Sequence, residues 1–419
     1  MPIANVRYHC PPFVAHFRSV AVGTTSLPNL LLAPCVQLVV PRLKEISSLA
    51  ILLCHLTMQQ HTCLLAVYAR AFPPGIPQAG PATLKIELLT PSGPFSIGTR
   101  IYEWVDSSRP ERATNKSAAF RELIVQVWYP VKNARRSMAP YVPRLEAYRQ
   151  VWEPKDVEVA GRVLTHAHLD EKPLSGQHFP VVLFSHGWQG TRTEYTSIAE
   201  DLASHGFAVF GIDHPYMGRI ALSNGQVTEP TEDQFENQAE IRNYYGQDFK
   251  FVIDQIVKLN VGDTDDAFTG KLEVSRIGAI GHSSGFVAAA TACMTDRRIA
   301  ACANVDAGGY SANDLRALRQ PLLWLRLKRA GPLPNEFLKD RREPSYELLL
   351  EDANHSSVED WDYIEAESSE QRESAADRLR ILRKYIGAFF LEYLQGQKSA
   401  LLKEGSSNSN VNFQIHLAQ

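Results

Sequence analysis

The segment from Ile277 to Phe286 constrains the fold of this chain more than any other. It begins with a short apolar run, continues as Gly-x-Ser-x-Gly around Ser283, and leads into an alanine-rich stretch that favours a helix. A strand, a sharp turn and a helix in this order form a nucleophile elbow, in which small residues two before and two after the serine let strand and helix pass closely. The flanking patterns strengthen a five-letter motif that alone is a moderate signal. Ser283 is therefore the candidate nucleophile.

A serine hydroxyl is a weak nucleophile and needs a neighbouring base that an acid orients. In enzymes built on this turn, the acid and then the histidine follow the serine along the chain. Of the thirteen histidines, only His355 and His416 come after Ser283. His355 follows the apolar run 346–350 in a short polar loop, whereas His416 lies behind a segment rich in serine and asparagine that shows no sign of packing. We predict His355 as the base and keep His416 as the alternative.

The acid must lie between the serine and that loop. From the strand pattern 299–305 onwards, the candidates are Asp306, Asp314, Glu336, Asp340, Glu343, Glu347, Glu351 and Asp352. Only Asp306 ends a buried-strand pattern, 299–305, and the tips of parallel strands are where such sheets present catalytic side chains. The alternative is that Asp306 merely caps a turn. Asp213, at the tip of an earlier strand, is a rival acid, but it precedes Ser283 and would break the expected order.

Strands and helices alternate from residue 93 onwards. The runs 97–105 and 123–129 alternate apolar and polar residues, as half-exposed antiparallel strands do, and the apolar run 179–184 is typical of a strand buried on both faces. Further strands are expected at 208–212, 299–305, 322–327 and 346–350, and helices at 194–205, around 249–257, at 287–293 and at 375–394. The pattern predicts an α/β fold, a mostly parallel central sheet with helices on both faces. Residues 133–178 are expected to be irregular.

The two ends of the chain differ from this domain. Residues 1–84 carry five basic residues against one acid and give no clean signal peptide. The stretch 47–69 is long enough for a membrane helix, but polar side chains in its middle make a span costly. We expect an extension at 1–84, either a leader or a mispredicted start, a catalytic domain at 85–396 and a polar tail at 397–419. Secretion, peripheral attachment and a cytoplasmic location all stay open.

Composition narrows the possible partners. The net charge is −3 and charged residues make up 21% of the chain, without a basic stripe or a Cys/His metal spacing. We therefore predict neither a nucleic-acid partner nor a metal site. Cys293 and Cys302, on the predicted helix and strand after the elbow, are interpreted as buried small hydrophobic residues.

Five groups of residues carry a family resemblance: Gly93-Pro94-Phe95 with Gly98-Thr99, Arg121-Glu122-Leu123 leading to Val127-Trp128-Tyr129-Pro130, Phe184-Ser185-His186-Gly187, Asp201-Leu202-Ala203-Ser204-His205-Gly206, and Gly281-His282-Ser283. With them the chain resembles the platelet-activating-factor acetylhydrolase family, the plasma or group VII phospholipase A2 type, of the α/β-hydrolase superfamily. The match runs from about residue 93 to residue 393.

The resemblance implies an α/β-hydrolase fold and the same three residues, with Ser283 as nucleophile, Asp306 as acid and His355 as base. It places the oxyanion hole on the backbone N–H groups of Trp188 and Ser284, and implies no metal or organic cofactor. Family members commonly read Gly-His-Ser-Phe-Gly-Gly, so Ser284 replaces an aromatic residue here. The backbone donor survives that change.

Other polar residues near these motifs have simpler expected roles. His186 is expected to shape the oxyanion turn, and His282 to be a packed neighbour that points away from the nucleophile. His205 and His214, at a helix end and a strand end, are expected to cap or to lie at the surface. Phe286 stands where the family has glycine, which leaves the helix packing and the acyl pocket open.

The implied activity is that of a serine esterase acting on short or oxidised sn-2 acyl groups of phospholipids, of the 1-alkyl-2-acetylglycerophosphocholine type. Its partners would be a small-molecule or lipid ester and a lipid surface, with the oligomeric state open. The alternatives are a general short-chain carboxylesterase or polyester hydrolase, and a catalytically silent binding protein on the same fold. The polar insertion 215–234 has few apolar residues to line a long channel, which predicts a preference for short acyl groups.

Overall fold

The computed structural model describes residues 84–113, 119–231, 235, 238–262, 267–405 and 408–417. The chain divides into two units, residues 1–79 and 80–419, and the first lies outside the described residues. The stretch 47–69, with its possible membrane span, therefore lies outside them as well. Among the helices that are described, none combines the length and the apolar character that a membrane span requires.

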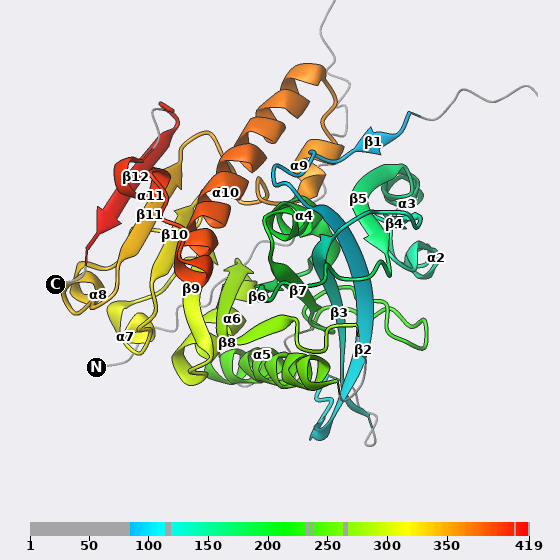
Figure 1. Ribbon diagram of the computed structural model, residues 1–419, viewed down its shortest axis with the longest axis horizontal. Helices are drawn as coiled ribbons and strands as arrows, with labels where there is room; N and C mark the ends of the chain where they lie inside the picture. Colours follow the sequence, from blue (N-terminus) through cyan, green and yellow to red (C-terminus); the bar gives the residue numbers. More distant parts are fainter. Residues whose placement is uncertain are drawn as a thin grey trace, which may run out of the picture. The chain divides into compact units, whose positions relative to one another are not determined.

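One mixed sheet forms the centre of the second unit (Figure 1). Its strands within the described residues are β1 (Ile86–Glu87), β2 (Ser96–Pro110), β3 (Phe120–Val131), β4 (Met138–Pro140), β5 (Val163–Leu169), β6 (Phe179–Ser185), β7 (Ala208–Asp213), β8 (Leu272–His282), β9 (Ile299–Val305), β10 (Leu322–Arg326), β11 (Ser345–Leu350) and β12 (Val411–His416). Their order is β1-β5-β2-β3-β7-β6-β8-β9-β10-β11-β12, with β4 paired to β5. The strands from β7 to β11 in this order are parallel, and β2 and β3 are antiparallel, as predicted.

Helices cover both faces of the sheet, which confirms the predicted fold class (Figure 1). The helical elements are α2 (Leu145–Tyr148), α3 (Pro154–Ala160), η1 (Arg192–Tyr195), α4 (Thr196–Ser204), α5 (Gln238–Val261), α6 (Ser284–Thr295), α7 (Ala312–Leu315), α8 (Asn335–Lys339), α9 (Asp360–Ile364), α10 (Ser369–Gln395) and α11 (Leu401–Glu404). Because successive side chains of a strand point to opposite faces, Leu183 of β6 packs with α5 and α6, whereas Val182 and Phe184 pack with α4 and α10.

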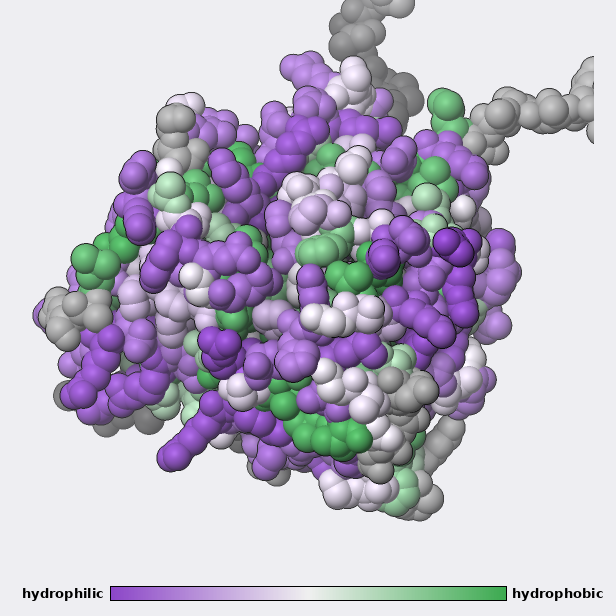
Figure 2. All heavy atoms as spheres, viewed as in Figure 1, coloured by the Kyte–Doolittle hydropathy of each residue, from purple (hydrophilic) through white to green (hydrophobic). Residues whose placement is uncertain are grey.

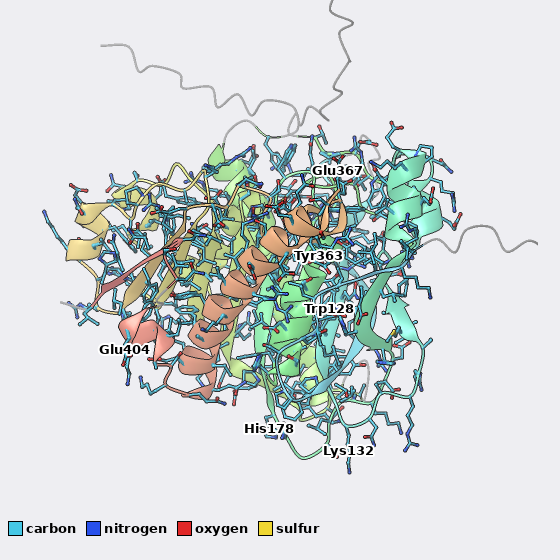
Figure 3. All side chains as sticks on the ribbon, turned by 90° about the horizontal axis from the view of Figure 1, so that it is seen from above. Trp128, Lys132, His178, Tyr363, Glu367 and Glu404 are labelled. Atoms are coloured by element: carbon cyan, nitrogen blue, oxygen red, sulfur yellow. A yellow bond between two sulfur atoms is a disulfide. The ribbon has the colours of Figure 1, made fainter. Side chains whose placement is uncertain are left out.

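The long helix α10 begins and ends where the sequence indicates. The Ser368 hydroxyl accepts a hydrogen bond from the N–H of Gln371, a cap that is worth about 1 kcal/mol. Gly396 ends the helix with φ 74°, in the left-handed region that favours glycine. Figure 3 shows α10 crossing the sheet from Glu367, just before its first turn, towards Glu404 in α11.

The segment 133–178, expected to be irregular, holds four regular elements, β4, α2, α3 and β5. Its apolar residues form a small separate core with α9, in which Tyr141 packs near Ile364. The pattern was missed because these elements are short and their exposed positions are polar. On the face that Figure 2 shows, hydrophilic residues predominate and apolar residues appear in separate patches.

The C-terminal residues differ from the expected unpacked tail. Residues 411–416 form β12, which pairs antiparallel with β11 and puts His416 opposite Ser345. Val411, Phe413 and Ile415 pack against the core on the α10 side. Their spacing of two is the strand period, a signal that the surrounding serine and asparagine residues obscure.

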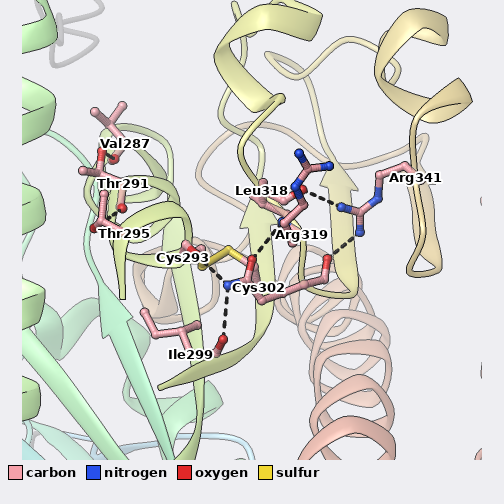
Figure 4. Close-up of a disulfide and its surroundings, with 10 residues drawn as sticks. Val287, Thr291, Cys293, Thr295, Ile299, Cys302, Leu318, Arg319 and Arg341 are labelled. Atoms are coloured by element: carbon pink, nitrogen blue, oxygen red, sulfur yellow. Dashed lines mark hydrogen bonds between the residues drawn. A yellow bond between two sulfur atoms is a disulfide. The ribbon is translucent and has the colours of Figure 1, made fainter. Parts of the chain in front are cut away.

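Cys293 and Cys302 are buried, as expected, but they form a disulfide rather than acting as free apolar side chains (Figure 4). The bond joins the last turns of α6 to β9, the strand that follows it. Their Cα atoms lie 6.5 Å apart, within the range that a disulfide can bridge. A sequence separation of nine residues shows neither this distance nor the direction of the side chains.

Candidate active site

The predicted elbow lies between β8 and α6. Ser283 has φ 51° and ψ −124°, a strained conformation for a residue with a side chain. A Cβ atom on Gly281 would lie 2.4 Å from the backbone of Gly285, and one on Gly285 would lie 2.3 Å from the carbonyl oxygen of His186. These contacts explain why the elbow needs small residues on both sides of the serine. Strand, turn and helix together hold the Ser283 side chain in a half-buried position.

The loop between β11 and α9 brings His355 to the serine. Its Nε2 lies 3.0 Å from Ser283 Oγ, and its Nδ1 lies 2.7 Å from Asp306 Oδ2. We call Ser283, His355 and Asp306 the candidate triad. His416 is on the edge strand β12, with Glu347 at 3.8 Å as its carboxylate neighbour. The geometry therefore brings together the three residues predicted from the order of the chain, and their catalytic roles remain predictions.

Asp306 follows β9 and is completely buried. Its carboxylate accepts hydrogen bonds from four consecutive backbone N–H groups, those of residues 327–330 after β10, at 2.8–3.1 Å. Burial alone would raise the pKa of Asp306, but the His355 hydrogen bond and these N–H groups outweigh it and lower the pKa to about 2. The side chain is thus ionised at neutral pH. The sequence indicated the acid but not these donors, which come from the end of the neighbouring parallel strand.

The rival acid Asp213 contacts Arg192 and not His355. It accepts a hydrogen bond from the Arg192 backbone N–H at 2.6 Å and forms an ion pair with the Arg192 side chain. It therefore fastens η1 to the end of β7, and His355 contacts Asp306 instead.

The turn after β6 lies against the nucleophile. A Cβ atom on Gly187 would be 3.4 Å from Ser283 Cβ. His186 holds this turn as expected, since its Nδ1 donates to the Gly187 carbonyl at 2.7 Å and its Nε2 accepts from the His214 N–H at 3.0 Å. Burial, with the neighbouring His214, lowers the pKa of His186 to about 3, so its ring is neutral.

The two backbone groups expected to form the oxyanion hole are those of Trp188, in this turn, and Ser284, in the first turn of α6. The first N–H groups of a helix have no partner within it. Within the described part of the chain, neither the Trp188 nor the Ser284 N–H donates to another protein group. Both are therefore available to a ligand, and their assignment remains a prediction.

His214 was expected to cap a strand end or to lie at the surface. The structure shows instead that it is completely buried. Its Nε2 lies 2.9 Å from Ser185 Oγ and its Nδ1 lies 2.7 Å from Asp248 Oδ2. We call Ser185, His214 and Asp248 the buried triplet. The sequence could not show it, because Asp248 comes from α5, thirty-four residues further along the chain.

Asp248 is held by two guanidinium groups. Arg121 contacts it at 2.7 Å and Arg109 at 2.8 Å. Although burial alone would raise the pKa of Asp248, Arg121 and His214 hold it well below its usual range. Arg121 belongs to one of the motifs that carry the family resemblance. Its ion pair with Asp248 is a structural reason for an arginine at this position.

Comparisons with known proteins agree with these motifs. A family model described as platelet-activating factor acetylhydrolase, isoform II, matches residues 85–258. A probable 1-alkyl-2-acetylglycerophosphocholine esterase of Arthroderma benhamiae is 27% identical over 270 residues, 59% of this chain and 64% of that protein. Platelet-activating factor acetylhydrolase of Canis lupus familiaris is 25% identical over 197 residues, 40% of this chain and 44% of its own length. The predicted family resemblance is confirmed.

The match to the platelet-activating factor acetylhydrolase family covers only part of this chain and part of the relatives. The chain spans less than two thirds of the length of these curated relatives. The family model covers the oxyanion turn and ends before Ser283. A solved structure, the ferulic acid esterase from Streptomyces cinnamoneus, extends further: it is 29% identical with a TM-score of 0.66 and covers 78% of this chain and 99% of that one. This likeness supports the α/β-hydrolase fold beyond the family match.

The aromatic residues Phe286 and Trp188 differ in their surroundings. Phe286, where the family has glycine, is completely buried and packs edge-on against Tyr310 and Trp324 at 5.4 and 5.7 Å. It therefore belongs to the core. Trp188, in the turn after β6, is half-buried. The described part of the insertion, 215–231, buries Met217 and Ile220, so part of it packs into the domain.

Proposed function

We propose that this protein is a serine esterase that hydrolyses short or oxidised acyl esters through Ser283, His355 and Asp306. The observation that carries the proposal is the continuous line of hydrogen bonds from the Ser283 hydroxyl through His355 to Asp306. Ser283 stands on a strained turn, and the backbone N–H groups of Trp188 and Ser284 nearby have no protein acceptor among the described residues. The family match and the names of the relatives support the same chemistry.

In the proposed mechanism, Ser283 Oγ attacks the ester carbonyl carbon while His355 Nε2 takes the hydroxyl proton. The Trp188 and Ser284 N–H groups stabilise the negative oxygen of the tetrahedral intermediate. His355 then gives its proton to the leaving alkoxide oxygen as the carbon–oxygen bond breaks, which leaves an acyl-enzyme. A water molecule repeats the sequence: His355 takes its proton, and Ser283 regains one when the acid leaves. Asp306 stays ionised and holds the ring with its proton on Nδ1.

The proposed substrate class follows the relatives. One is named for a 1-alkyl-2-acetylglycerophosphocholine ester and others for platelet-activating factor. We propose a phospholipid with a short or oxidised sn-2 acyl group, met as a monomer or at a lipid surface. The polar insertion and the half-buried Trp188 support a short acyl pocket. Each methylene that finds an apolar wall contributes about 0.8 kcal/mol, and one that finds none contributes nothing.

A second candidate is a general short-chain carboxylesterase, because the similar solved structure is a ferulic acid esterase. The two candidates are distinguished by comparing kcat/KM for a 2-acetyl phospholipid with kcat/KM for ethyl acetate, which has the same acyl group without the phospholipid. The proposed function requires the phospholipid to be the better substrate.

A fluorophosphonate probe tests the chemistry itself. Active protein should be labelled on Ser283, and p-nitrophenyl acetate and butyrate should be hydrolysed faster than the octanoate and palmitate esters. Heat-denatured protein serves as the control. Absence of labelling would favour the silent binding protein, and a maximum at octanoate or beyond would contradict the short acyl pocket.

A further inference from the structure

His282 precedes the nucleophile and lies buried behind it, with 1% of its surface exposed. Its Nε2 is 3.1 Å from the backbone carbonyl oxygen of His355. Its Nδ1 is 2.8 Å from the hydroxyl oxygen of Tyr195. The rings of His282 and His355 lie against each other with their centroids 4.5 Å apart. Both nitrogens of a ring that takes no part in the proposed chemistry are thus engaged.

These contacts define where each proton is. The His355 carbonyl can only accept, so His282 carries its proton on Nε2. Burial and the neighbouring His355 lower the pKa of His282 to about 3, so the ring is neutral and its Nδ1 accepts. The Tyr195 hydroxyl must therefore donate to Nδ1, and its oxygen accepts from the Gly187 N–H at 3.3 Å. The hydrogen bonds all point one way, from Gly187 through Tyr195 and His282 to His355.

This bridge joins the two halves of the site. Gly187 lies in the turn after β6 that carries the Trp188 N–H, and His355 lies in the loop after β11. The two segments come from strands that are not neighbours in the sheet. A base and an oxyanion donor act on the same ester group, so their separation must be held to a fraction of an ångström.

We propose that His282 and Tyr195 are positioning residues that hold the His355 loop at a fixed distance from the oxyanion turn. The inference rests on the proposed esterase function and adds two residues to it. Neither touches the substrate; both act through the residues at their ends.

The carboxyl group of Glu359 competes with His282 for the hydrogen bond that the Tyr195 hydroxyl donates. Glu359 Oε1 is 3.5 Å from the Tyr195 oxygen and 3.6 Å from His282 Nδ1. Burial raises the pKa of Glu359 to about 8, against the lowering effect of its hydrogen bond with Tyr195. When Glu359 is protonated, the Tyr195 hydroxyl keeps donating its hydrogen bond to His282 Nδ1, whereas the Glu359 carboxylate that forms as pH rises competes for that hydrogen bond. The titratable groups that face Glu359 are Tyr195 and Glu194 of η1, His282 of β8, Asp360 and Asp362 of α9, and Tyr141.

Three variants test the bridge. His282→Leu removes both hydrogen bonds, Tyr195→Phe removes one oxygen, and His282→Gln keeps a donor and an acceptor. We expect kcat on p-nitrophenyl butyrate to fall about 50-fold, about tenfold and less than about threefold, respectively, because a tenfold loss corresponds to 1.36 kcal/mol of barrier. KM should stay within about twofold, since the bridge acts on the chemical step and not on ground-state binding.

Two further readouts separate positioning from packing. The double variant Tyr195→Phe/His282→Leu should be no slower than His282→Leu alone, because one bridge is lost in both. In the wild type, kcat/KM should decline as pH rises through about 8, and Glu359→Gln should remove that decline because its amide does not ionise. Tyr393→Phe, which removes a hydroxyl bonded to Tyr346 far from the site, is the control and should keep full activity.

Each outcome decides something. If Tyr195→Phe and His282→Leu keep kcat within about twofold while the melting temperature falls, the bridge is packing and the inference is overturned. If His282→Leu does not fold, Tyr195→Phe decides by the same criterion. If the wild type neither turns over an ester nor reacts with the fluorophosphonate probe, the proposed function fails and takes the inference with it.

Discussion

The candidate triad and the buried triplet are two sets of serine, histidine and aspartate with nearly the same hydrogen bonds. The serine–histidine and histidine–aspartate distances are 3.0 and 2.7 Å in the first and 2.9 and 2.7 Å in the second. Their settings differ. Ser283 stands half-buried on a strained turn, whereas Ser185 ends β6 and is completely buried with both of its partners. The hydrogen-bond distances alone therefore do not distinguish the two serines, whereas their backbone conformation and their exposure do.

The two acids also differ in what holds them. Asp306 is held by backbone N–H dipoles and keeps its net negative charge, which can stabilise a positive ring on His355 during catalysis. Asp248 is paired with Arg121 and Arg109, which also contact Glu111 and Asp106, so it belongs to a network of two guanidinium groups and three carboxylates. The first arrangement favours proton transfer, and the second favours a fixed, buried structure.

The largest expected difference between the two sets is in turnover. Ser283→Ala should lower kcat by about 10⁵-fold or more, and combining it with His355→Ala should add little, because triad members act as a unit. Ser185→Ala should keep kcat within about tenfold. Initial rates on p-nitrophenyl butyrate measure both. His416→Ala is the matched control, and its loss of activity in place of the His355 variant would refute the assignment of the base.

Changing the acids should separate activity from stability. Asp306→Asn should lower kcat by about 10⁴-fold, because the amide favours the wrong tautomer of His355. Asp248→Asn should instead lower the free energy of unfolding by about 3–5 kcal/mol, because it removes the buried carboxylate that both Arg121 and Arg109 contact. Urea unfolding and steady-state rates on both variants check this. Equal effects of the two substitutions on kcat would remove the distinction drawn above.

Among the described residues, a disulfide lies close in the chain to the candidate triad but not to the buried triplet. The Cys293–Cys302 bond fastens the end of α6, the helix that starts beside Ser283. Closing a loop of this length is worth about 2–3 kcal/mol. The double variant Cys293→Ala/Cys302→Ala should unfold at a lower urea concentration with kcat within about twofold. A loss of activity without a loss of stability would show that the bond controls the elbow rather than the fold.

The smallest effect concerns acid stability. The folded pKa of Asp306, about 2, is lower than its unfolded value, so its ionised form contributes stability above the unfolded pKa, and that contribution is lost as pH falls from about 4 through 2. The urea midpoint of the wild type should drop over this range by more than that of Asp306→Asn. Identical slopes would show that the carboxylate gains nothing from its four N–H donors.

Much of the domain could be predicted because its signals are local. The buried run 179–184 occupies six residues and the elbow segment 277–286 occupies ten, and their apolar run or glycine spacing is a direct consequence of one strand or one turn. The missed strands give weaker signals. β4 is short, β5 carries threonine and histidine among its apolar residues, and β12 is a half-exposed edge strand in a polar segment.

By itself the sequence predicted the candidate triad: a serine in a Gly-x-Ser-x-Gly turn, an acid that follows a buried-strand pattern after that serine, and a histidine in the loop beyond. The physical reason is that each depends on the conformation of its own few residues. Only the tertiary structure decided which groups surround them, namely the N–H donors of residues 327–330, the burial of His214 and the bridge through His282. These depend on contacts between residues from about twenty to more than seventy positions apart, and such contacts exist only once the sheet has brought the ends of its strands together.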